Sequence, residues 1–226
     1  MWGICSPEGF LFDCDIYCGK DSSVQCEKLS ILNKCALGSP VVLQMVFKLL
    51  SSTIPMKLQK YHLYFDNFFT NPDLLVHLKK LGLQATGTVR NNRVNVQNSL
   101  NKNAARGTYV VQHERNSGMN YITVMDSKQV SILSTMSGVT PIGKVKRYSP
   151  NEKERIEIDF PRSFLYYKKF MGGVDSHDAF CSKLLPPIRA KKWTWSILMR
   201  IVQSSLSNAT VLRNLASYDK KTKVYL

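Results

Sequence analysis

The stretch KYHLYFDNFFTNPDLLVHLKKLGLQATGTVR, residues 60–90, decides the fold. Aromatic and branched residues at 61–65 indicate a strand, and Asp66 follows at its C-terminal end. An Asn-Pro pair then favours the start of an amphipathic helix, Gly82 favours its end, and a second strand is expected at 85–89. A strand, a helix and a second strand form the unit expected of a mixed sheet covered by helices, so we predict an α/β fold.

The regions on either side of this unit extend the same pattern. A core helix is predicted to begin at Pro40, with Ser39 as its N-cap, in the run LGSPVVLQMVFKLLSS. After a polar, Asn-rich loop, alternating apolar residues and an Asn-Ser-Gly turn predict three strands, at 108–113, 120–125 and 129–134.

The two ends of the chain are expected to add short strands and helices. The first segment indicates two short strands joined by a turn at 6–9. The stretch 144–162 is expected to be a charged connector, and an aromatic-rich helix is expected to follow it. A last helix is predicted over 193–215, with an apolar stripe facing the core. This stripe comprises residues 197, 198, 201, 202, 206, 209 and 212.

Carboxylates stand in otherwise apolar or glycine-rich surroundings in two places. One is Asp66, and the other is MGGVDSHD, residues 171–178. Asp175 and Asp178 lie three residues apart, which places both on one face of a helix, and the glycine pair before them allows a sharp turn. A charge in such a setting is costly unless a cation compensates it, and Mg²⁺ prefers oxygen ligands of this kind. Alternatively, Asp175 and Asp178 are helix-start residues and Asp66 is a turn residue.

The composition is that of a globular protein with a strong positive charge. The chain has 226 residues and a formal net charge of +15, which favours association with polyanions, so we expect nucleic acid as the partner. A solubilising charge, or an acidic protein partner, is the alternative. No apolar run reaches roughly 18 residues, so we expect no membrane span. The first residues do not form a signal peptide, and we expect an intracellular protein.

The six cysteines do not predict a metal site. They form no CxxC pair, and no paired histidines stand at finger spacing, so a structural zinc is not expected. Buried free thiols are the preferred interpretation, and a disulfide framework is not expected either.

Basic residues stand next to aromatic residues in a pattern that suits a DNA-facing surface, because cationic groups neutralise phosphate and an indole can stack on a base. Two candidates, Arg90 and Arg93, lie in a polar, basic loop and could contact phosphate, and the candidates beside aromatic residues are Arg189, Lys191, Lys192 and Trp193. The first two can equally belong to a solvated loop. Trp193 can equally anchor the last helix.

Together, the motifs DNFFT at 66–70, GTVRNNR at 87–93 and FMGGVDSHD at 170–178, followed by KKW at 191–193, resemble the piggyBac transposase family and stand in the family's order. The resemblance implies an RNase H-like mixed sheet flanked by helices, with a β-rich insertion between the second and third acidic positions. It also implies a nuclear protein in which three aspartates hold two Mg²⁺ or Mn²⁺ ions for DNA strand cleavage and transfer.

The resemblance assigns individual positions. Asp66 matches the second catalytic aspartate, Asp175 the third and Asp178 a further acidic position, and metal binding is assigned to Asp66 and Asp175. Ser6 stands where the family has its first aspartate. Because a hydroxyl is neutral, this replacement removes a charged metal ligand, and catalysis should be weakened or lost. Trp193 matches a family tryptophan near the active site.

We therefore expect the RNase H-like domain to occupy 1–90 and 147–226, with the β-rich insertion at 91–146. The expected function is that of a truncated, transposase-derived DNA-binding protein, impaired for transposition. The alternatives are a residually active metal-dependent nuclease and a non-enzymatic protein-interaction domain. Homodimerisation is possible, but the region that usually mediates it is expected to be absent.

Overall fold

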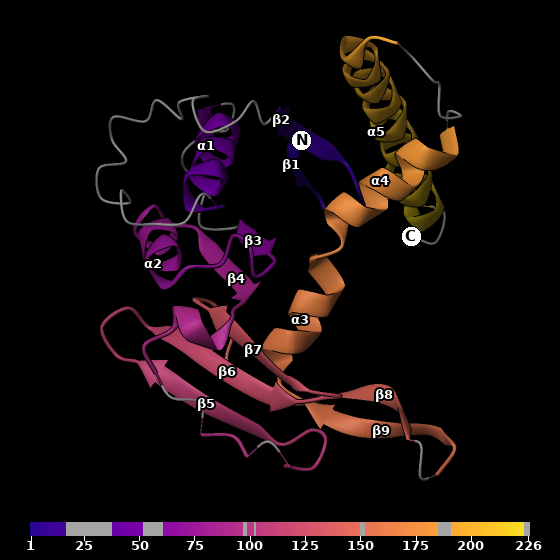
Figure 1. Ribbon diagram of the computed structural model, residues 1–226. Helices are drawn as coiled ribbons and strands as arrows, with labels where there is room; N and C mark the ends of the chain where they lie inside the picture. The colour runs from indigo at the N-terminus through magenta and orange to yellow at the C-terminus, as the bar shows by residue number, and fades with distance from the viewer. Residues whose placement is uncertain are drawn as a thin grey trace. The chain divides into compact units, whose positions relative to one another are not determined.

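In a computed structural model, the chain forms two compact units (Figure 1). Unit 1 comprises Met1–Ser23 and Phe170–Leu226, and unit 2 comprises Val24–Lys169. The described residues are 1–16, 38–51, 61–96, 99–101, 103–149, 152–184 and 191–223.

Unit 2 is built on a five-stranded mixed sheet with the strand order β3-β4-β7-β6-β5. Its strands are β3 (His62–Phe65), β4 (Gln84–Thr88), β5 (Tyr109–Glu114), β6 (Met119–Met125) and β7 (Gln129–Ser134). β3 and β4 are parallel and the other neighbours are antiparallel, which confirms the predicted strand, helix, strand unit and the three further strands. Strands from the predicted insertion thus continue the sheet of β3 and β4. The boundaries predicted for three domain segments stay a prediction.

Helices α1 (Gly38–Ser51) and α2 (Pro72–Lys80) pack against this sheet. The Asn71 side chain caps α2 by accepting a hydrogen bond from the Asp73 N–H at 2.9 Å, and Gly82 leaves the helix with a left-handed φ of 82°, as the sequence predicts. The start of α1 differs slightly from the prediction. Ser39 lies buried within the helix, which begins at Gly38, two residues before the predicted start at Pro40.

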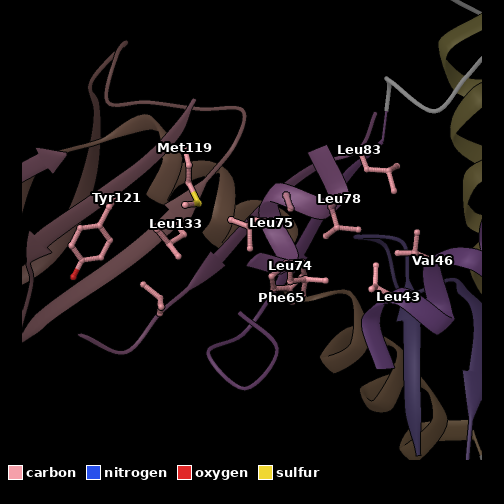
Figure 2. Close-up of a cluster of buried hydrophobic side chains, with 12 residues drawn as sticks. Leu43, Val46, Phe65, Leu74, Leu75, Leu78, Leu83, Met119, Tyr121 and Leu133 are labelled. Carbon is pink, nitrogen blue, oxygen red and sulfur yellow. The ribbon is translucent and has the colours of Figure 1, made fainter. Parts of the chain in front are cut away.

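The core of unit 2 occupies both faces of the sheet. On one face, α1 and α2 pack their apolar side chains against β3, β4, β6 and β7 (Figure 2). The neighbouring residues Ile132 and Leu133 on β7 point to opposite faces, and Ile132 belongs to a second cluster. This second cluster contains Val145, Ile158, Phe160 and Phe164 from the segments that follow β7.

The predicted connector at 144–162 is wrong, because this stretch forms an antiparallel hairpin of β8 (Gly143–Ser149) and β9 (Glu154–Phe160). Val145 and Ile158 are buried, whereas Lys144 and Lys146 on either side of Val145 are exposed. This alternation is that of a strand pair with one covered face, and the density of charge on the other face concealed it. Helix α3 (Arg162–Phe170) follows, as predicted.

Unit 1 contains a hairpin and two helices. These elements are β1 (Trp2–Cys5), β2 (Leu11–Asp15), α4 (Gly173–Leu184) and α5 (Trp193–Lys223). The hairpin and its turn are as predicted. Among the described residues, no helix is long and apolar enough to cross a membrane.

The helix predicted at 193–215 exists as α5, but the prediction that its apolar stripe faces the core is wrong. The exposed residues include Leu198, Ile201, Val202, Leu206, Ala209 and Leu212. Among residues 193–217 of this helix, the buried positions are Ser204, Ser207 and Val211. Polar side chains on this face hydrogen-bond to the hairpin and to α4, so the helix turns its polar face inward within unit 1.

Candidate functional site: carboxylates and basic residues

Asp66 lies directly after β3, in a turn that fixes its carboxylate. Its Oδ1 atom accepts a hydrogen bond from the Phe68 N–H at 2.9 Å. Its carbonyl oxygen accepts hydrogen bonds from the Thr70 N–H at 3.2 Å and the Thr70 hydroxyl at 2.7 Å. Alternation along the strand places Asp66 on the same side as Tyr64 and His62. The candidate ligand is therefore held by local backbone contacts at the carboxyl end of a strand.

The side of the sheet near Asp66 carries phenols. The Tyr167 hydroxyl lies 3.3 Å from the Thr88 hydroxyl, which joins α3 to the end of β4. Burial raises the pKa of Tyr167, and the negative charge of Asp66 raises it further. Asp66 thus lies near a partly buried, polar surface made by β3, β4 and α3. Sequence reasoning missed Tyr167, although its place in an aromatic helix was a signal.

His62 is a packed residue of β3. Its Nε2 atom lies 2.8 Å from the Thr86 hydroxyl, and its Nδ1 atom lies 3.0 Å from the Tyr64 hydroxyl. Burial lowers the pKa of His62 to about 4 and raises the pKa of Tyr64 to about 12, with the neighbouring Tyr166 adding to the latter. Both ring nitrogens of His62 therefore have partners within the sheet.

Two arginines that were predicted to contact DNA have different environments. Arg90 is exposed. Arg93, in the short 3₁₀ helix η3 (Asn91–Arg93), donates from Nη1 to the carbonyl oxygens of three residues in the turn after β3. These are Asn67 at 2.5 Å, Phe68 at 3.1 Å and Thr70 at 3.1 Å. DNA contact by either arginine stays a prediction.

In unit 1, Ser6 lies in the turn of the β1–β2 hairpin. Its backbone N–H donates to the Phe10 carbonyl oxygen at 2.8 Å, and its hydroxyl oxygen accepts from the Phe10 N–H at 3.2 Å. The Ser6 carbonyl oxygen accepts from the Gly9 N–H at 3.0 Å. The residue at the position of the missing aspartate is thus part of a hydrogen-bonded turn.

This turn lies against the start of α4. A Cβ atom on Gly173 would stand 2.3 Å from the Ser6 carbonyl oxygen. A Cβ atom on Gly9 would stand 3.0 Å from the backbone nitrogen of His177. A turn forms at Met171 and Gly172, as predicted, but neither Gly172 nor Gly173 has a left-handed φ. Instead, Gly173 allows close backbone approach. Ser6 therefore lies beside the helix that carries Asp175.

Asp175 and Asp178 both lie on α4, as predicted, but their environments differ. Asp175 is exposed in the first helical turn. Asp178 forms an ion pair with Arg200 of α5, a partner that sequence reasoning missed. Burial raises the pKa of the nearby Cys5 thiol to about 12, and the charge of Asp178 contributes. Asp178 thus has a cationic partner within unit 1.

His177, between the two aspartates, is buried and connects three elements. Its Nδ1 atom lies 2.9 Å from the Gly9 carbonyl oxygen, and its Nε2 atom lies 3.1 Å from the Ser204 hydroxyl. Sequence reasoning gave this histidine no role, and the only signal was its place in the DSHD motif. It joins the hairpin turn, α4 and α5.

The donor chemistry of Asp66 and Asp175 suits a hard cation such as Mg²⁺, because both provide carboxylate oxygen. Asp66 belongs to unit 2 and Asp175 to unit 1. Over the described residues of either unit, no group of three or more His, Cys, Asp or Glu side chains is placed to hold a metal ion. Metal binding by Asp66 and Asp175 therefore stays a prediction.

The basic residues predicted near the last helix lie at its start. Lys191 and Lys192 are exposed directly before α5, and Trp193, its first residue, is 75% exposed. The exposure of Trp193 argues against the alternative that it anchors the helix within unit 1. Arg189 lies outside the described residues.

Comparison with known proteins identifies the family. Residues 1–210 match the family model described as Transposase IS4. The chain is 36% identical over 173 residues to human PiggyBac transposable element-derived protein 3, which covers 74% of the chain and 28% of that protein. The chain belongs to the piggyBac transposase family. Human PiggyBac transposable element-derived protein 2 is 28% identical over 179 residues, covering 77% of the chain and 30% of that protein.

A solved structure establishes the fold of this piggyBac-family chain. The piggyBac transposase in a synaptic complex with hairpin DNA superposes with a TM-score of 0.68 at 18% identity, covering 95% of this chain and 40% of the transposase chain. The predicted RNase H-like fold is confirmed. The chain spans less than a third of the length of these two human relatives.

Proposed function

We propose that this piggyBac-family chain binds DNA and is impaired for strand cleavage and transfer because Ser6 occupies the position of the first catalytic aspartate. The observation that carries the proposal is the contact between the Ser6 turn and the start of α4, two residues before Asp175. A carboxylate at residue 6 would be next to the Asp175 helix. A serine hydroxyl there is neutral and already accepts a hydrogen bond from the Phe10 N–H.

The proposed metal ligands are Asp66 and Asp175. When bound between such carboxylates, Mg²⁺ or Mn²⁺ supplies Lewis-acid activation of a phosphodiester and of its attacking water or hydroxyl. Asp66 has one oxygen committed to the Phe68 N–H, which orients its other oxygen. Asp178 is paired with Arg200, so we assign it a supporting role in which it holds α4 against α5. With two carboxylates in place of three, affinity for a pair of cations should be low.

DNA binding is supported by the start of α5. Lys191 and Lys192 are exposed there, and α5 has no acidic residue in its first turn, so the positive end of the helix dipole is not offset locally. The adjacent Trp193 offers an exposed indole for stacking on an unpaired base. Arg90 offers a further exposed cation in unit 2. Binding to chromosomal DNA implies a nuclear location.

Incubation of the purified chain with supercoiled plasmid and Mg²⁺ or Mn²⁺ tests the proposal. We expect no nicking by the chain as it is, and higher Mn²⁺ affinity in Ser6→Asp, with Ser182→Asp on the exposed side of α4 as the charge-matched control. Nicking that Asp66→Ala abolishes would instead establish a residually active nuclease. Equal Mn²⁺ affinity in the two serine variants would refute the assignment of residue 6.

A protein-interaction role is the second candidate, and the exposed apolar face of α5 favours it. The two functions differ in their response to salt. Binding to DNA through phosphate contacts weakens steeply as salt rises, whereas binding of a protein to an apolar face does not. DNA affinity that is undetectable at low salt would favour the second candidate.

A further inference from the structure

The turn that carries Asp66 is held by one side chain from a distant part of the sequence. Arg93 Nη1 donates to the carbonyl oxygens of Asn67, Phe68 and Thr70, at 2.5, 3.1 and 3.1 Å. Three backbone carbonyl groups that leave a strand in a tight turn need donors, and a charged donor forms stronger hydrogen bonds than a neutral one. Arg93 therefore fixes the backbone of the whole turn.

The same backbone orients the Asp66 carboxylate. Phe68 donates its N–H to Asp66 Oδ1, and Thr70 donates both its N–H and its hydroxyl to the Asp66 carbonyl oxygen. Two of the three residues whose carbonyl groups accept from Arg93 are thus the residues that bind Asp66. A change in the position of the Arg93 guanidinium passes directly to the carboxylate through these residues.

Glycines confine the turn on its other sides. A Cβ atom on Gly87 would stand 2.2 Å from the Thr70 hydroxyl, and a Cβ atom on Gly38 would stand 2.7 Å from the Phe68 carbonyl oxygen. Strand β4 and the start of α1 therefore pack directly on the turn. The glycines provide close packing, and Arg93 provides hydrogen-bond donors.

Arg93 is itself anchored to the sheet through η3. Its N–H donates to the Arg90 carbonyl oxygen at 3.0 Å. The Asn91 side-chain oxygen accepts from the Tyr121 hydroxyl at 3.2 Å and the Ser131 hydroxyl at 3.3 Å. Hydrogen bonds of Asn91 thus hold η3 against β6 and β7, and those of Arg93, two residues further along η3, hold the Asp66 turn.

We propose that Arg93 is a positioning residue for Asp66, setting the direction of its carboxylate toward a divalent cation by clamping the three carbonyl groups of the turn. The inference rests on the proposed function, which assigns metal binding to Asp66. It separates the two arginines of the GTVRNNR motif: Arg90 is exposed and available to phosphate, whereas Arg93 acts within the protein.

Measurement of Mn²⁺ binding to the full chain tests this role, at a temperature well below unfolding. The electron paramagnetic resonance signal of free Mn²⁺ reports the binding. Arg93→Met should weaken Mn²⁺ binding about tenfold, the scale on which partners of metal ligands act. Arg115→Met removes the same charge from an exposed turn of unit 2 and should leave Mn²⁺ affinity unchanged. Val145→Ala, in the second core cluster, should lower stability without weakening Mn²⁺ binding.

Amide hydrogen exchange gives a readout that does not need the metal. In Arg93→Met, exchange at Phe68 and Thr70 should accelerate, while exchange in the ladder between β5 and β6 should not. If Arg93→Met does not fold, Arg93→Gln, which retains a shorter donor, should show the same changes at smaller size.

The outcomes are distinguishable. Unchanged Mn²⁺ affinity in Asp66→Asn would overturn the metal assignment in the proposed function. Weaker binding in Asp66→Asn together with unchanged binding in Arg93→Met would overturn only the role of Arg93. Equal losses in Arg93→Met and Val145→Ala would also overturn it, because the effect would then follow general stability.

Discussion

At the residue scale, two adjacent glycines have different surroundings, although the sequence presents them as a pair. Gly173→Ala would place a methyl group 2.3 Å from the Ser6 carbonyl oxygen, and because that neighbour is backbone, the turn or α4 must move. We expect a loss of about 1–3 kcal/mol in the free energy of unfolding, typical of overpacking. Urea denaturation measures this loss.

Gly172→Ala is the matched control for that prediction. The Cβ atom of an alanine at this position would have no neighbour within 4 Å, and the φ of Gly172 is not left-handed, so the added methyl group meets no obstacle. The variant should be neutral or gain up to about 1 kcal/mol from reduced freedom of the unfolded chain. Similar losses in the two variants would show that the contact between the hairpin turn and α4 does not form.

Also at the residue scale, His62 should make stability depend on pH. Burial lowers its pKa from 6.5 to about 4, so in this window the unfolded chain binds the proton more strongly than the folded chain. The contribution of neutral His62 to the free energy of unfolding is fully present above pH 6.5 and is lost as the pH falls toward 4. Allowing for partial exposure, we expect a loss of about 1–2 kcal/mol. Urea denaturation across this range should give a flatter profile for His62→Gln.

At the element scale, the sequence predicted those elements in which each local signal agreed with the others. Helix α2 has an Asn cap, a proline in its first turn and a glycine after its end, and β3 and β4 flank it in parallel. The β8–β9 hairpin was missed because Lys144, Lys146 and Glu157 fill its exposed face, so its charge outweighed the alternation of Val145 and Ile158. Charge content alone does not distinguish a loop from a solvated strand face.

The prediction of which face of α5 points to the core was wrong, for a physical reason that sequence periodicity does not contain. Both faces of the helix have a regular period, and the polar face is the one with specific partners: Ser204 meets His177, and Asn208 bonds the backbone of Leu11 in both directions. A buried polar face requires these matching groups. They come from segments far away in the sequence, so no local sequence pattern predicts them.

This arrangement predicts that substitutions on the polar face of α5 lower the free energy of unfolding more than substitutions on its apolar face do. Leu198→Gln and Val202→Gln, on the exposed face, should change the free energy of unfolding by less than about 0.5 kcal/mol. Ser207→Leu, on the buried face, should cost about 1–3 kcal/mol through overpacking. Thermal and urea denaturation of the three variants check the order. A larger loss for the glutamine variants would mean that the apolar face is covered in solution.

At the scale of the whole molecule, the motifs identified the family and the fold, but they did not supply the partners that fix the candidate ligands. The clamp of the Asp66 turn by Arg93 and the contact of Gly173 with Ser6 each join residues distant in sequence. Such contacts depend on tertiary packing, which a single sequence does not display. Convergence of Asp66 with Asp175, which belong to different units, stays a prediction.

The net charge of +15 is distributed unevenly, and this distribution leads to a prediction about DNA binding. Lys191 and Lys192 stand exposed before α5, a helix without acidic residues in its first turn. In contrast, Lys144 pairs across the β8–β9 hairpin with Asp159 and lies 3.6 Å from Glu157, and Lys146 is opposite Glu157. Lys191 and Lys192 are therefore available to phosphate, whereas Lys144 and Lys146 stand opposite carboxylates that offset part of their charge.

Replacing Lys191 and Lys192 by alanine should weaken binding to duplex DNA and reduce the slope of log affinity against log salt by about 2. The same double replacement at residues 144 and 146 removes equal charge and should leave the slope almost unchanged. Fluorescence anisotropy with a labelled duplex over a series of salt concentrations measures both slopes. Equal reductions would mean that DNA responds to overall charge, without preference for the start of α5. Affinity that does not depend on salt would mean that phosphate contacts do not hold the DNA at all.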